Sequence, residues 1–143
     1  MRPEAVPPIE PAPASRVRLI DVDPDRGELR EQILAAAAQA KADGRAVAVE
    51  LWASWCPPCK KLDHLLRSAG PVATAVDLAV LIRVDTDVFG DELNALGYTA
   101  PQIPSLYHVD AMGKPRGKPM SGAQWTRDSE AAIAEQLATF LAG

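Results

Sequence analysis

The feature that most constrains this chain is an apolar run of strand length that leads directly into two closely spaced cysteines. Residues 46–52 are Ala-Val-Ala-Val-Glu-Leu-Trp, and Cys56 and Cys59 follow shortly after. A near-continuous apolar run of this length is typical of a central strand that is buried on both faces of a sheet. Apolar residues then recur at helical spacing between residues 62 and 69, so we expect the cysteines at a strand-to-helix junction.

The hydrophobic pattern of the remaining chain predicts an α/β fold. Strands are expected at 17–22, 46–52, 78–84, 105–109 and 116–121, and helices at 28–43, from the cysteines to about 70, at 91–96 and at 128–141. Alternation of strands and helices implies parallel strands, and a turn containing Gly113 closes the last two strands into an antiparallel hairpin. The predicted order is β-α-β-α-β-α-β-β-α, which gives a central mixed β-sheet flanked by helices.

The length of 143 residues fits one domain preceded by a proline-rich segment. We expect residues 1–16 to form a flexible tail or linker, because they are rich in proline and poor in large apolar side chains. Residues 17–143 form the expected domain. The start of the chain lacks the apolar stretch of a signal peptide, which favours a cytoplasmic location for the chain as given. A periplasmic location is expected instead if the tail follows a removed anchor or signal.

Charge and hydropathy exclude two classes of function. The net charge is −4, whereas proteins that bind nucleic acid carry clustered lysine and arginine. No apolar run reaches the roughly 20 residues that a membrane-spanning helix needs. We therefore expect no nucleic-acid partner and no membrane span in this chain, and we expect a monomer.

The spacing of the two cysteines indicates redox chemistry. A disulfide across two residues closes too short a loop to stabilise the fold much. At the exposed N-terminus of a helix, the thiolate of Cys56 is stabilised by the helix dipole and is expected to be the more reactive. Cys59, one turn further on, can attack the resulting mixed disulfide. Pro57 and Pro58 fit here because amides of the first turn have no partner within the helix.

A zinc site is the alternative interpretation of the cysteine pair. His64, His108 or Asp63 could then complete the ligand set. A structural zinc ion usually takes four ligands in two close pairs, and the sequence has no second pair. We therefore expect no metal.

The segment from Trp52 to Lys60, Trp-Ala-Ser-Trp-Cys-Pro-Pro-Cys-Lys, resembles the active-site segment of the thioredoxin superfamily, and the order of elements is similar over residues 17–143. The resemblance extends to thioredoxin itself and to the C-terminal domain of the transmembrane thiol–disulfide interchange reductase. It implies that Ile103 precedes a cis Pro104 that faces the dithiol, and that Gly122 borders the substrate groove. Trp55 could belong to the core, but because it lies beside Cys56 we expect it to form a partly exposed wall of the substrate surface.

Glu50 is the most informative residue outside the dithiol, because it interrupts a strand that is expected to be buried. An unpaired buried carboxylate is costly. The resemblance places Glu50 where the family has a buried acid beneath the second cysteine, and there it could take the proton of Cys59. The alternative is that Glu50 turns to a solvated edge or pairs with Arg83.

The sequence therefore predicts a thiol–disulfide oxidoreductase that reduces or exchanges protein disulfides without a cofactor. Its partners would be protein disulfide substrates and an upstream reductase. Because Pro57 and Pro58 offer no amide hydrogen to Cys56, we expect a weakly stabilised thiolate and a reducing protein. A disulfide oxidase or isomerase that uses the same site, and a non-catalytic binding module with the same fold, remain alternatives.

Overall fold

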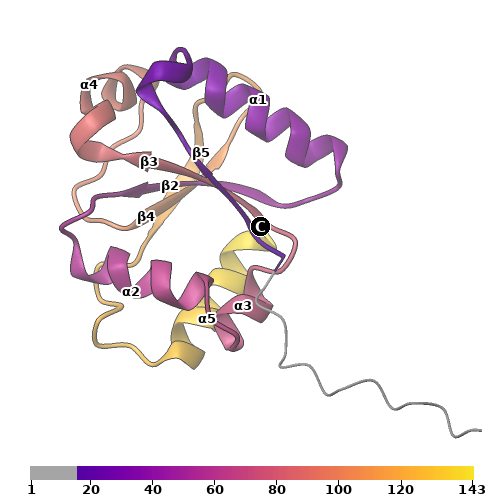
Figure 1. Cartoon of the computed structure of the whole chain (residues 1–143), viewed down its shortest axis with the longest axis vertical. Helices are drawn as coiled ribbons and strands as arrows, with labels where there is room; N and C mark the ends of the chain where they lie inside the picture. The colour runs from indigo at the N-terminus through magenta and orange to yellow at the C-terminus, as the bar shows by residue number, and fades with distance from the viewer. Residues whose placement is uncertain (1–15) are drawn as a thin grey trace, which may run out of the picture.

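The computed structural model describes residues 16–143, in which one five-stranded sheet lies between two layers of helices (Figure 1). Residues 1–15, most of the predicted tail, lie outside the described part. The strands are β1 (Arg18–Asp21), β2 (Val47–Trp52), β3 (Val80–Asp85), β4 (Ser105–Val109) and β5 (Pro115–Ser121). The α-helices are α1 (Leu29–Ala42), α2 (Pro57–Leu66), α3 (Pro71–Ala75), α4 (Thr86–Leu96) and α5 (Glu130–Leu141), and η1 (Pro24–Arg26) is a 3₁₀ turn.

The sheet has the strand order β1-β3-β2-β4-β5, with both parallel and antiparallel pairs. Strands β1, β3 and β2 run parallel, whereas β4 is antiparallel to both β2 and β5. This arrangement confirms the predicted α/β class, the mixed sheet and the closing hairpin. It also makes β2 the central strand, so that the segment leaving its carboxyl end lies near the middle of the sheet's edge.

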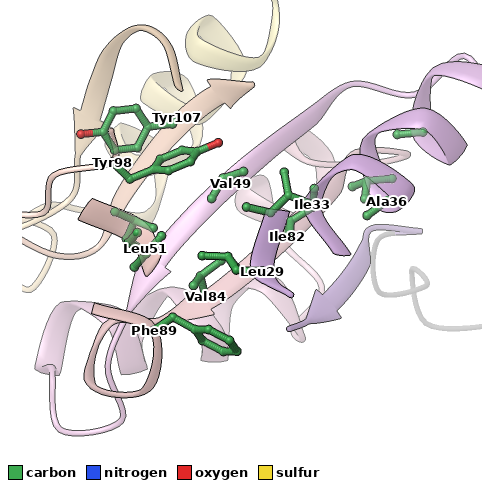
Figure 2. Packing of buried hydrophobic residues seen from close by; sticks show 13 residues of the cluster. Leu29, Ile33, Ala36, Val49, Leu51, Ile82, Val84, Phe89, Tyr98 and Tyr107 are labelled. Carbon is green, nitrogen blue, oxygen red and sulfur yellow. The ribbon is translucent and has the colours of Figure 1, made fainter. Parts of the chain in front are cut away.

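Two apolar cores form because successive residues of the central strands point to opposite faces of the sheet. Helices α1 and α4 cover one face, and α2, α3 and α5 cover the other (Figure 1). In the first core, α1 places Leu29 and Ile33 against Val49 and Ile82 (Figure 2). The second core contains Ala48, Leu62, Leu66, Leu81, Leu106, Trp125, Ile133 and Leu137, among others.

Two helices differ from the sequence-based prediction. Helix α3 was not predicted, because five residues are too few to show a helical hydrophobic period. Helix α4 begins at Thr86 rather than at residue 91, and the side chain of Asp85 caps it by accepting from the Asp87 amide at 2.8 Å. Its backbone is not helical at Phe89, which interrupts the apolar pattern near its start.

The predicted boundary between tail and domain at residue 16 stays a prediction. Arg16, the last residue of the predicted tail, donates its backbone amide to Asp77 Oδ1 at 2.8 Å and its side chain to Asp77 Oδ2 at 2.7 Å. None of the helices in residues 16–143 combines the length and the apolar character needed to cross a membrane.

Candidate active site

Cys56 is the N-cap residue of α2, directly after the turn that leaves β2. Its backbone is extended, and Pro57 occupies the first helical position. Its Sγ accepts the amide of Cys59 at 3.3 Å, and the two cysteines form a disulfide with a Cα–Cα distance of 5.2 Å. The chain thus places both sulfurs at the positive end of a helix.

Exposure does not distinguish the two cysteines in this oxidised form. Cys56 is 2% exposed and Cys59 is 3% exposed, and they pack together with Ala53, Trp52 and Ile103. The expectation that Cys56 alone lies at an exposed helix terminus is therefore not met. Its position at the N-cap, where it receives a helix amide, is what separates it from Cys59.

The loop before β4, which contains Ile103 and Pro104, packs against the dithiol through Ile103. The bond between Ile103 and Pro104 is cis, as predicted, and the carbonyl oxygen of Ile103 lies 3.5 Å from Cys56 Sγ. Strand β4 begins at Ser105, which pairs with Leu51 near the end of β2. This register brings residues 103–104 to the edge of the sheet from which the cysteine segment leaves.

Gly122 directly follows β5 and lies next to Pro104. Its amide donates to the carbonyl of Pro104 at 2.7 Å. A side chain at this position would overlap the buried ring of Trp125, so the close approach requires glycine. The structure thus brings together Ile103, Pro104 and Gly122, and their role in binding substrate stays a prediction.

Trp55, next to Cys56 in the sequence, lies on the surface rather than in the core, and its role as a wall of the substrate surface stays a prediction. It is 61% exposed, and its indole nitrogen donates to Asp87 Oδ2 at 2.9 Å. Val88, the next residue of α4, is 51% exposed. The sequence offered no signal for the Asp87 contact, because the two residues are 32 positions apart.

Glu50 is buried on the α2 side of the sheet and faces Arg83 of the adjacent strand. The two residues are register partners in the β2–β3 pair, and they are 1% and 5% exposed. Arg83 Nε lies 3.6 Å from Glu50 Oε1, and within residues 16–143 neither atom has a hydrogen-bond partner. The pairing with Arg83 that was an alternative for Glu50 is therefore present, together with full burial.

Arg83 also connects this buried pair to the surface. Its Nη1 lies 3.0 Å from Asp63 Oδ1 and 3.6 Å from Asp21 Oδ1, and its guanidinium stacks 4.7 Å from the Trp52 ring centroid. An open pocket of about 380 Å³ is lined by Cys59 together with Trp52, Asp63 and Arg83. Asp63 and Arg83 therefore line the same pocket as the second cysteine.

Burial raises the pKa of Glu50 to about 7. Desolvation is the main cause, the positive charge of Arg83 lowers the pKa, and the charges of Asp63 and Asp21 raise it again. A carboxyl group with this pKa exchanges its proton readily at neutral pH. Its role as acceptor for the Cys59 proton stays a prediction.

The residues considered for a zinc site take other positions. His64 is exposed on α2, and His108 stacks on Phe140 with ring centroids 4.0 Å apart. Asp63 pairs with Arg83 and Arg67. In the described part of the chain, no group of three or more histidine, cysteine, aspartate or glutamate residues could hold a metal ion.

Comparison with known protein families shows which family this chain belongs to. The model of the Thioredoxin family matches residues 32–135, which include Glu50, both cysteines, Pro104 and Gly122. The chain belongs to the thioredoxin family. With a Cys56–Cys59 disulfide at the N-terminus of α2, this thioredoxin-family protein is a thiol–disulfide oxidoreductase.

Individual relatives agree with this assignment. Over 90 residues the chain is 33% identical to the thiol:disulfide interchange protein DsbD of Cronobacter sakazakii, a match that covers 57% of the chain but only 15% of that relative. The structure of Trichomonas vaginalis thioredoxin is 26% identical with a TM-score of 0.53, covering 85% of this chain and 96% of that one. A disulphide isomerase from Xylella fastidiosa shares the fold, with 22% identity, a TM-score of 0.61, and coverage of 85% and 93%.

Proposed function

We propose that this thioredoxin-family protein reduces protein disulfides. The Cys56 thiolate attacks one sulfur of a substrate disulfide, and the other substrate sulfur leaves as a thiolate. Cys59 then attacks the mixed disulfide at Cys56, which forms the Cys56–Cys59 disulfide and releases the second substrate thiol. Two electrons pass to the substrate in each cycle, and an upstream dithiol must return them.

The observation that carries the reducing direction is the hydrogen bonding of Cys56 Sγ. Helix α2 begins with Pro57 and Pro58, which have no amide hydrogen. The amide of Cys59 donates to Cys56 Sγ at 3.3 Å, and the positive end of the helix dipole adds to this hydrogen bond. Weak stabilisation of the thiolate disfavours the reduced form, and a protein of this kind tends to give up its electrons.

The buried acid supports turnover rather than simple binding. Cys59 must lose its proton when it attacks the mixed disulfide, and Glu50 has a pKa of about 7 on the α2 side of the sheet. Arg83 and Asp63 line the same pocket as Cys59. We assign Glu50 the role of proton acceptor for Cys59, directly or through water, because a binding module has no need for a buried carboxyl group of this pKa.

The docking edge is assigned to Ile103, Pro104 and Gly122, with Trp55 as the exposed wall beside it. The carbonyl of Ile103 lies next to Cys56 Sγ, and Gly122 donates to the carbonyl of Pro104. A substrate segment seated on this edge would present its disulfide to Cys56. The similarity to an interchange protein supports a second dithiol protein as the electron donor.

The test is insulin reduction in dithiothreitol, combined with a redox equilibrium against glutathione. We expect the wild-type protein to accelerate insulin precipitation, the Cys56→Ser variant not to do so, and the potential to lie near that of thioredoxin, about −270 mV. A potential near about −120 mV, that of a strong disulfide oxidant, would instead support an oxidase. Failure of the wild-type protein to accelerate precipitation would support a binding module.

A further inference from the structure

Lys61 connects the helix that carries the dithiol to the loop that follows β5. It lies in α2, two residues after Cys59, and its side chain is partly buried. Its Nζ donates to the carbonyl of Trp125 at 2.6 Å and to the carbonyl of Asp128 at 2.7 Å. Hydrogen bonds from a charged donor are stronger than neutral ones, so these two contacts hold the loop firmly against α2.

The same loop begins with Gly122, one residue of the edge proposed to bind substrate. Trp125 donates its amide to the carbonyl of Gly122 at 2.9 Å, and its buried ring packs directly against the Cα of Gly122. Gly122 in turn donates to the carbonyl of Pro104, the residue after Ile103. A continuous set of contacts therefore runs from Lys61 through Trp125 and Gly122 to Pro104.

The other side of the loop is held by α5. Gln136 accepts the indole N–H of Trp125 at 2.9 Å and donates to Asp128 Oδ2 at 3.2 Å. These contacts fix the loop to a helix that does not carry the cysteines. Lys61 holds the loop to α2, the helix that carries the cysteines, through two charged hydrogen bonds, in addition to the packing of Trp125 in the core that contains Leu62 and Leu66.

We propose that Lys61 is a positioning residue that holds the Pro104–Gly122 edge at a fixed distance from the dithiol, and thereby determines how well extended protein substrates are bound. This inference rests on the proposed function. A small displacement of a docking edge weakens a reaction that depends on it, because the reacting atoms must meet in one geometry. A small aromatic disulfide needs access to Cys56 Sγ alone and is indifferent to the edge.

The experiment compares Lys61→Met, which removes the donor, with Lys61→Arg, which restores a positive donor. Lys118→Met is the matched control, because Lys118 is an exposed lysine of β5 and its loss changes the net charge equally. Each variant is assayed with insulin and with 5,5′-dithiobis(2-nitrobenzoate). Amide hydrogen exchange of Gly122 reports on the edge directly, whatever the activity.

We expect Lys61→Met to raise the KM for insulin at least about fivefold while its rate with the small disulfide stays within about twofold, since only the former uses the edge. Exchange of the Gly122 amide should accelerate at least about tenfold, and Lys61→Arg should reverse both changes. Lys118→Met should behave as the wild type. Should Lys61→Met not fold, Lys61→Leu, which also lacks a donor, is judged by the same criteria.

Two results would overturn the inference. One is an unchanged KM for insulin with unchanged exchange at Gly122. The other is an equal loss with both substrates, which would place the effect of Lys61 on the dithiol itself or on general stability. A wild-type protein that does not reduce insulin would contradict the proposed function, and exchange at Gly122 would still show whether Lys61 holds the edge.

Discussion

At strands β2 and β3, the two faces of the sheet bury different kinds of side chain. On the face covered by α1, Val49, Ile82 and Val84 are fully buried among apolar neighbours. On the face covered by α2, the adjacent residues Glu50 and Arg83 are a buried ion pair with two unpartnered atoms in the described part. Both faces have an apolar core, but at these two strands the α1 face buries only apolar side chains, whereas the α2 face also buries a carboxyl and a guanidinium group.

The free-energy cost of burying charges is the main difference between the two faces at these strands. Taking two charges out of water costs several kcal/mol per ion, and a buried ion pair can often be replaced by apolar residues at no loss of stability. The contact between Arg83 Nε and Glu50 Oε1 is 3.6 Å, longer than a hydrogen bond. A pair with such geometry contributes little to stability, which agrees with the proton-acceptor role proposed for Glu50.

The largest expected effect is on the apolar face. Ile82→Ala should lower the free energy of unfolding by about 2–5 kcal/mol, because the cavity left at a fully buried position cannot close. Urea denaturation measures the loss. The activity of the folded fraction with insulin should stay near that of the wild type, and a comparable loss of activity in that fraction would erase the distinction between the two faces.

The second prediction concerns the pH dependence of stability. The folded state raises the pKa of Glu50 from its ordinary value of 4.5 to about 7, so it binds this proton more tightly than the unfolded state does. The corresponding stability is present below about pH 4.5 and is lost as the pH rises to about 7. At about 1.4 kcal/mol per pKa unit, the loss is on the order of 3 kcal/mol.

Urea titrations of the wild type and Glu50→Gln at pH 4.5 and pH 8 test this pH dependence of the free energy of unfolding. The glutamine variant should gain stability relative to the wild type as the pH rises. Glu92→Gln, an exposed substitution on α4, should run parallel to the wild type. A constant difference between wild type and Glu50→Gln would show that Glu50 does not titrate with a raised pKa.

The third prediction is kinetic. Glu50→Gln should leave the attack by Cys56 nearly unchanged and slow the release step by about 10²-fold, the lower end of what a positioned base contributes. A mixed disulfide between Cys56 and the substrate should then accumulate, which quenched-flow mass spectrometry detects. Equal slowing of both steps would indicate a general structural defect instead.

The smallest expected effect concerns Arg83. Its charge lowers the pKa of Glu50, so Arg83→Met should raise that pKa further and move the pH profile of the release step to higher pH. Arg67→Met is the matched control, because Arg67 also pairs with Asp63 but is exposed. A profile that shifts equally in both variants would place the effect in Asp63 rather than in the buried pair.

The sequence predicted the fold and the sulfur chemistry because both depend on local patterns. The apolar run at 46–52 and the Cys56–Cys59 spacing are readable from adjacent residues, whereas the cis bond before Pro104 was expected from the resemblance to the thioredoxin superfamily. What it could not provide were contacts between distant segments. The contact of Trp55 with Asp87, the attachment of Lys61 to Trp125, and the position of Asp63 beside Arg83 all require the sheet register and the packing of α2 against the sheet.

The central claim is a division of labour between the two sulfurs, and alkylation of the reduced protein tests it most directly. The amide of Cys59 and the helix dipole both favour the thiolate of Cys56, so we expect Cys56 to be the more reactive thiol in the reduced protein. Iodoacetamide at pH 7, followed by peptide mass spectrometry, should show Cys56 modified first. Faster modification of Cys59 would contradict the account, because it would make the supposed resolving thiol the nucleophile.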